Sequence, residues 1–138
     1  SAACPNEFVS EEEIKTTISI LNAFGKAEVV PENLFDVVTG ISGSGPAYVF
    51  LFIEALADAA VVGGMPRKQA YEFAAQTVYG AAKMVMETGK HPGELKDMVC
   101  SPAGTTIAAV RTLEANNFRS AVIEGANAAT EKSVAMRG

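Results

Sequence analysis

The segment 46–62 restricts the fold of this chain more than any other, because it predicts a helix that is apolar on nearly every side. An ordinary surface helix carries one apolar stripe, whereas a helix that is apolar all round has to be enclosed by other elements. A chain of 138 residues buries only about two-thirds of its surface. The segment therefore demands either a tight bundle within the chain or a second chain that covers it.

Extended to residue 65, the segment is long enough to suggest a membrane span. Glu54 and Asp58 lie in its middle, and one charge at the bilayer centre costs about 2.5 to 3.5 kcal/mol. We therefore expect no membrane span. Much of the apolar content is alanine, and small residues let helices of two subunits approach closely and interleave. A dimer and a monomeric bundle both remain open at this point; the small residues are Ala57, Ala60, Gly80, Ala81, Gly125, Ala126 and Ala129.

The first 30 residues have a different pattern. Ser10 and Glu13 form a capping box at the start of a predicted helix, and Gly25 supplies its left-handed stop. Residues 27–30 read as a short strand, which needs a neighbouring strand, and the residues before Ser10 are too few to supply one. Residues 1–30 are therefore expected to be the last strand-helix-strand turn of an α/β domain whose body is missing.

Residues 31–138 are predicted to be helical throughout. A short helix at 33–39 is followed by a flexible turn at 42–46, where Pro46 suits the first position of the apolar helix. The later breaks are marked by glycine, proline and asparagine: 63–66, Gly89, 91–93, 100–106 and 116–117.

Composition excludes several functions. The net charge is −5, and no basic run exceeds two residues, so nucleic acid is not an expected partner. Cys4 and Cys100 lie far apart, and His91 is the single histidine. This pattern predicts neither a metal site nor a disulfide framework. The start of the chain lacks a signal-peptide layout, so we expect a reducing, cytoplasmic location.

Three features have a plain structural interpretation. His91 precedes Pro92 and reads as a cap residue better than as a catalytic base. Glu54 and Asp58 share one helix face and could form an acid–base pair, but pairing with a cation or a backbone group at a helix interface is favoured. The glycines at 42–46 lack the GxGxxG spacing of a dinucleotide site.

Residues 101–106, Ser-Pro-Ala-Gly-Thr-Thr, are different in kind. They bring hydroxyl groups and a glycine to the predicted start of a helix, where unpaired N–H groups and the positive dipole end favour an anion. A carboxylate or a phosphate would fit. An ordinary helix cap without a ligand remains the alternative.

The chain resembles delta-1-pyrroline-5-carboxylate reductase over nearly its whole length. The resemblance rests on several segments in the same order: CPNEFVSEEE, AFGK, VTGISGSGPAYVFLFIEALADAA, GMPRKQAYEFAAQTVYGAAKM, HPGELKDMVCSPAGTTIAAVRTLE and FRSAVIEGANAATEKS. It implies a mainly α fold, an interleaved helical dimerisation domain at 31–138, preceded at 1–30 by the C-terminal remnant of a Rossmann-like dinucleotide-binding domain. It also implies a homodimer, or a larger assembly, that reduces 1-pyrroline-5-carboxylate to L-proline with NADPH or NADH.

Carried over by position, the resemblance implies that the N–H groups of Gly104 and Thr105 and the Ser101 hydroxyl hold the substrate carboxylate. The Thr106 hydroxyl would reach the ring nitrogen as the catalytic residue. Val99 and Cys100 would lie toward the nicotinamide, while the rest of the cofactor would be held by a domain outside this chain.

One position departs from the family, which usually has glycine where this chain has Ala103. If the backbone there has a positive φ, alanine costs about 1 kcal/mol. Without a GxGxxG segment, the chain by itself is not expected to bind a dinucleotide tightly or to turn over. Two other functions stay open: a non-catalytic helical dimerisation module, and the helical domain of another dinucleotide-dependent dehydrogenase.

Overall fold

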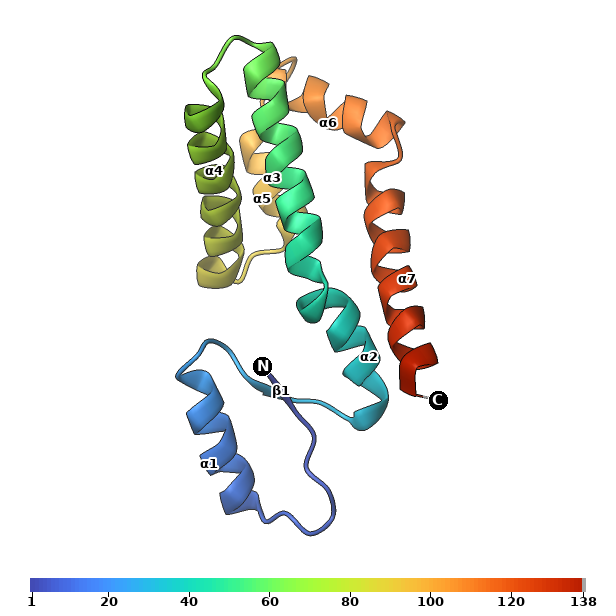
Figure 1. Ribbon diagram of the computed structural model, residues 1–138. Helices are drawn as coiled ribbons and strands as arrows, with labels where there is room; N and C mark the ends of the chain where they lie inside the picture. The colour runs from blue at the N-terminus through green and yellow to red at the C-terminus, as the bar shows by residue number, and fades with distance from the viewer. Residues whose placement is uncertain (138) are drawn as a thin grey trace. The chain divides into compact units, whose positions relative to one another are not determined.

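The computed structural model describes residues 1–137, most of which are helical (Figure 1). The chain divides into two compact units. Unit 1 comprises Ser1–Gly45 and the C-terminal residues from Gly125 onward, and unit 2 comprises Pro46–Glu124. The mainly α fold predicted from the sequence is confirmed.

Unit 1 begins with strand β1 (Ala2–Ala3), helix α1 (Glu11–Asn22) and strand β2 (Glu28–Val29). The strands are parallel, with Ala2 opposite Glu28 and Ala3 opposite Val29. The strand-helix-strand prediction is confirmed. The expectation that the residues before Ser10 are too few to form a strand was wrong. Two of them, Ala2 and Ala3, form the strand that pairs with β2.

Helix α1 starts as its sequence predicts. The Glu13 N–H donates to Ser10 Oγ at 3.3 Å, and the Ser10 N–H donates to Glu13 Oε2 at 2.8 Å. The Ser10 hydroxyl hydrogen bond, followed by that of the Ser10 backbone, lowers the pKa of Glu13. The predicted left-handed stop is wrong in detail: α1 ends at Asn22, the cap Ala23 is right-handed, and Gly25 has a φ of +142° in the turn beyond.

The connection from β2 to the apolar helix stays helical. A 3₁₀ turn η1 (Glu32–Leu34), helix α2 (Phe35–Val38) and a π-helical turn η2 (Thr39–Gly43) lead into helix α3 (Gly45–Val62). The flexible turn predicted at 42–46 is therefore wrong. The Ser42 hydroxyl donates to the Val38 carbonyl at 2.9 Å and the Ser44 N–H to the Thr39 carbonyl at 2.8 Å, so this segment keeps helical hydrogen bonding.

The C-terminal turns of helix α7 (Phe118–Arg137) pack on α2 and η2 within unit 1. A Cβ at Gly40 would overlap Thr130 Oγ1 and lie 3.0 Å from the Ala126 carbonyl, so only glycine allows this approach. The buried Asp36 carboxylate accepts a hydrogen bond from the Ser133 hydroxyl at 2.8 Å and pairs with Arg137. Sequence reasoning did not single out Asp36.

Unit 2 holds α3, α4 (Arg67–Thr88), α5 (Pro92–Val99), α6 (Thr105–Ala115) and the start of α7. The predicted breaks are confirmed: Gly89 caps α4 with a φ of +64°, and Asn117 turns the chain with a φ of +58°. The core between α3 and α4 consists of alanines, joined by partly buried larger side chains. Its members are Ala57, Ala70, Ala74, Ile53, Leu56, Ala60, Val61 and Met65.

Much apolar surface stays exposed. The accessible area is 10,380 Å², whereas a compact monomer of 14.4 kDa would expose about 6,800 Å². Even two separate compact domains of the sizes of units 1 and 2 would expose only about 8,200 Å² together. The excess includes large side chains on α3 and α4, namely Phe50, Leu51, Val62, Phe73, Tyr79 and Met86.

The continuous helical stretch Glu32–Val62 has 31 residues, and its most apolar window of 18 residues has a mean hydropathy of 1.6 and is 11% buried. By length and composition alone it could cross a membrane. The two charged side chains of the apolar helix α3, Glu54 and Asp58, are both exposed. The expectation that no part of the chain spans a membrane rests on these two charges and stays a prediction.

Candidate functional site

The loop between α5 and α6 closes into a tight turn. The Cys100 N–H donates to the Asp97 carbonyl at the end of α5, and the Gly104 N–H donates to the Ser101 carbonyl, both at 3.0 Å. Ala103 has a φ of +58°, the left-handed conformation that glycine adopts without strain. The condition for strain at Ala103, a positive φ, is therefore met.

Gly104 is required by lack of space. A Cβ on this residue would overlap Ser101 Oγ and lie 3.1 Å from the Ser101 carbonyl oxygen. The Ser101 side chain therefore folds over the Gly104 backbone. Because the Gly104 N–H is held by the Ser101 carbonyl, it is already committed within the turn, which the sequence alone did not indicate.

Helix α6 begins without a side-chain cap. Gly104 is its N-cap, and no side chain accepts from the first turn. The first helical hydrogen bond runs from the Ala108 N–H to the Gly104 carbonyl, at 3.4 Å. Within residues 1–137 the N–H groups of Thr105, Thr106 and Ile107 consequently have no acceptor, and they point out of the positive end of the helix dipole.

The hydroxyls of Thr105 and Thr106 are also uncommitted: neither makes a hydrogen bond within the described chain. Threonines inside the helices behave differently, since the hydroxyls of Thr77, Thr88 and Thr112 donate to the carbonyl four residues earlier. The two site threonines lie in the first turn, where the residues four positions back are in the loop. Backbone and hydroxyl donors thus meet at one helix start, the arrangement that binds an anion.

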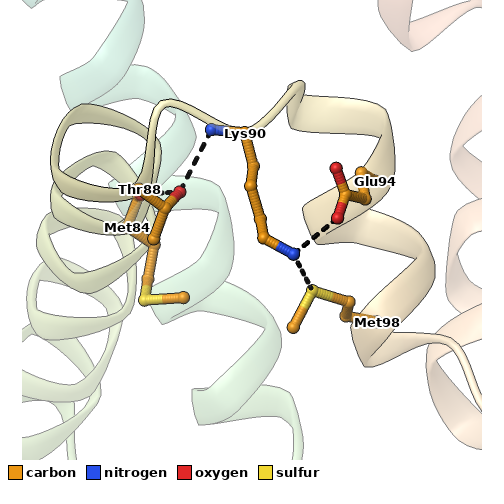
Figure 2. A network of polar contacts seen from close by, with 5 residues as sticks. All are labelled: Met84, Thr88, Lys90, Glu94 and Met98. Atoms are coloured by element: carbon orange, nitrogen blue, oxygen red, sulfur yellow. Dashed lines mark hydrogen bonds and ion pairs between the residues drawn. The ribbon is translucent and has the colours of Figure 1, made fainter.

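Helix α5, which leads into this loop, is held on α4 by a polar network (Figure 2). The Lys90 N–H donates to Thr88 Oγ1 at 3.2 Å, and Thr88 Oγ1 donates to the Met84 carbonyl at 2.7 Å. Lys90 Nζ lies 2.5 Å from Glu94 Oε1 and 3.9 Å from Met98 Sδ. Through Lys90, in the connection between the two helices, the network joins the end of α4 to α5.

The neighbours of the loop include charged and apolar groups. The pKa of Lys96 is raised, chiefly because its ammonium donates a hydrogen bond to Asp97, at 2.6 Å. Val99 is 66% exposed, and Cys100 is a half-buried free thiol. Cys4 is likewise free. Within residues 1–137 no group of three or more histidine, cysteine or acidic side chains is arranged to hold a metal.

The other candidates have structural roles. His91 is the N-cap of α5, and its Nδ1 accepts the Gly93 N–H at 3.0 Å, as expected for a cap residue. Asp58 pairs with Arg67 of α4, whose guanidinium also lies 5.6 Å from the centre of the Tyr71 ring. The interface role expected for Asp58 is confirmed. Glu54 makes no ion pair within the described residues.

Comparison with known proteins gives consistent matches. Residues 32–136 match the family model described as pyrroline-5-carboxylate reductase dimerisation. The pyrroline-5-carboxylate reductase of Escherichia coli (strain K12) is 60% identical over 133 residues, which are 96% of this chain and 49% of the relative. That of Arabidopsis thaliana is 52% identical over 124 residues, 90% of this chain and 45% of the relative.

Solved structures agree. The pyrroline carboxylate reductase of Plasmodium falciparum with NADP bound has a TM-score of 0.89 and 38% identity, covering 99% of this chain and 52% of that chain. The Coxiella burnetii pyrroline-5-carboxylate reductase has a TM-score of 0.91 and 37% identity, covering 95% of this chain and 49% of that chain. The chain thus spans about half the length of the relatives that it matches.

Proposed function

The chain belongs to the pyrroline-5-carboxylate reductase family, and from this membership we propose that it supplies the helical substrate-binding and dimerisation part of an NAD(P)H-dependent reductase. The reaction is the reduction of 1-pyrroline-5-carboxylate to L-proline. The observation that carries the proposal is the start of α6, where free N–H and hydroxyl donors converge without a cap. These donors create a local positive potential that can bind the substrate carboxylate, although the chain as a whole is acidic.

The division of the chain follows from this role. Residues 1–30 are the C-terminal end of a dinucleotide-binding domain, and residues 31–138 are the dimerisation and substrate-binding domain. The parallel β1–β2 pair supports the first assignment, because parallel strands joined by a helix are the building unit of such domains. The family match from residue 32 supports the second.

The substrate carboxylate is held by the Thr105 N–H, the adjacent Thr106 N–H and the Ser101 hydroxyl. Gly104 contributes mainly space, since its own N–H already donates to the Ser101 carbonyl and its missing Cβ lets Ser101 fold over the backbone. The Thr106 hydroxyl, free of any helix acceptor within residues 1–137, hydrogen-bonds the ring nitrogen. This places the imine carbon at a fixed distance from the carboxylate anchor.

The dinucleotide, NADPH or NADH, supplies the hydride when it is bound. Residues 1–137 have no glycine-rich turn between a strand and a helix that would cradle its phosphates, so this chain offers it only a small contact. The exposed Val99 side chain and Cys100 are suited to an aromatic ring, being apolar and next to the substrate loop. Their role is to position the nicotinamide, with the remaining contacts made outside this chain.

A second copy of the chain covers α3 and the other exposed apolar residues. Even against two separate compact units, the excess of accessible area is about 2,200 Å² per chain by the same scaling, so a dimer that covers it on both chains buries an area of the size found in obligate homodimers. A homodimer is the minimum assembly, and larger ones can build on it. Cytoplasmic location, with no membrane span and no nucleic acid partner, completes the proposal.

Substitution of Thr106 tests the site. In a full-length reductase polypeptide that carries this chain, Thr106→Ala is expected to lower kcat/KM for 1-pyrroline-5-carboxylate about tenfold or more, because the ring nitrogen loses its hydrogen bond. Thr112→Ala is the matched control on the same helix, since its hydroxyl serves only the Ala108 carbonyl. Equal kinetics of the two variants would remove Thr106 from the site, and the dimer should persist in both.

A further inference from the structure

The apolar helix α3 carries two carboxylates, and only one has a counter-ion among the described residues of its own chain. Asp58 pairs with Arg67 of α4. Glu54, one turn earlier, is exposed, and within residues 1–137 it makes neither an ion pair nor a hydrogen bond. A single unpaired charge on the most apolar helix of the chain calls for an explanation, since such charges are rarely covered without a partner.

Side chains of α3 contact two other helices of unit 2. Ile53 and Ala57 belong to the core against α4, and the Phe52 ring packs on Phe118, the first residue of α7, with ring centroids 5.8 Å apart. At about 100° per residue, Glu54 lies about 200° around the helix from Phe52. The start of α7 in the same chain is therefore on the opposite side of α3 from Glu54.

The proposed dimer, on which this inference rests, can supply the cation that Glu54 does not find in its own chain. If a second copy covers α3, the Glu54 carboxylate loses water, and a desolvated carboxylate without a cation is strongly unfavourable. We propose that Glu54 forms an ion pair across the dimer interface with Arg119 of a second copy. Because a two-fold interface is self-complementary, the pair occurs twice in each dimer.

Arg119 is the cation best suited to this role. In unit 2, three basic side chains have no acidic partner within the described residues: Lys68, Arg111 and Arg119. Arginine is preferred over lysine in interface ion pairs, because its guanidinium is less strongly hydrated and binds carboxylates through two hydrogen bonds. Arg119 follows Phe118, which anchors the start of α7 beside α3, so it borders the surface that the second copy covers.

Rescue between two different chains tests the pairing. Glu54→Arg and Arg119→Glu should each fold but raise the homodimer Kd about 30-fold or more, since like charges then face each other. Mixed in equal amounts, the two variants should form heterodimers with a Kd within a few-fold of the wild type, because both opposite-charge pairs are restored. Arg111→Glu mixed with Glu54→Arg should bind no more tightly than wild type mixed with Glu54→Arg, because one like-charge pair remains in either heterodimer.

The Kd of the wild-type homodimer is measured first, so a failure of the proposed dimer can be distinguished from a failure of the Glu54–Arg119 pair. A monomeric wild type would overturn both. A dimeric wild type with no heterodimer rescue, or rescue by Arg111→Glu in place of Arg119→Glu, would overturn the Glu54–Arg119 pair alone. If a reversal variant fails to fold, the cycle of Glu54→Gln and Arg119→Met replaces it: non-additive effects on Kd support the pair, and additive effects contradict it.

Discussion

At the scale of single residues, the loop before α6 carries strain at one position and a strict demand for space at the next. Ala103 is left-handed with a φ of +58°, while Gly104 has no room for a Cβ beside Ser101. Both residues belong to the turn that is closed by the hydrogen bond from the Gly104 N–H to the Ser101 carbonyl. This turn leads directly into the proposed carboxylate site. The loop thus keeps its geometry at some cost in stability.

Replacing Ala103 should recover part of that cost. Ala103→Gly is expected to raise the free energy of unfolding by about 0.5 to 1 kcal/mol, because relief of the left-handed strain exceeds the entropy that glycine adds to the unfolded chain. Urea denaturation with an unchanged m-value measures it. Asn117→Gly, at the other non-glycine position of positive φ, should gain less, since asparagine tolerates this conformation. A destabilised Ala103→Gly variant would refute the strain argument.

At the scale of elements, the sequence predicted the features that depend on residues close together in the chain, and missed those that depend on distant residues. Gly89, His91 and Asn117 act on their immediate neighbours, so the ends of α4, α5 and α6 could be predicted. The β1–β2 pair could not, because two residues show no periodicity. For the site, the helix start and its donors were predictable, but the Gly104 N–H hydrogen bond depends on the backbone of Ala103, and this became visible only in the structure.

The packing of α7 on α2 shows the same limit, because the Asp36–Ser133 hydrogen bond joins residues 97 positions apart. Asp36 is buried, whereas the Arg137 side chain is 52% exposed. Removing Arg137 therefore leaves the buried Asp36 carboxylate without its cation, whereas removing Asp36 leaves an Arg137 guanidinium that water can solvate.

This asymmetry predicts unequal effects of substitution. Arg137→Met should lower the free energy of unfolding by about 1 to 3 kcal/mol, since the Asp36 carboxylate stays buried with only the Ser133 hydroxyl. Asp36→Asn should cost less, because the amide still accepts from Ser133. The double variant should be no less stable than Arg137→Met alone, as judged by thermal or urea unfolding. A larger loss for Asp36→Asn than for Arg137→Met would contradict the buried-charge argument.

At the scale of the whole molecule, a single chain leaves many large apolar side chains exposed to solvent. Its core between α3 and α4 is made mainly of alanine, while large apolar side chains such as Phe50 and Leu51 stay about two-thirds exposed. Small residues at helix contacts and large ones outside are what a helical unit needs when a second chain completes its core. The family of dimerisation regions to which the chain belongs is consistent with this.

Sedimentation equilibrium of this chain at micromolar concentration tests that claim most directly. The account predicts a species of twice the 14.4 kDa chain mass, or a multiple of it, that persists on dilution through the micromolar range, because dissociation would return large apolar side chains to water. A folded species with the mass of a single chain across that range would contradict the account.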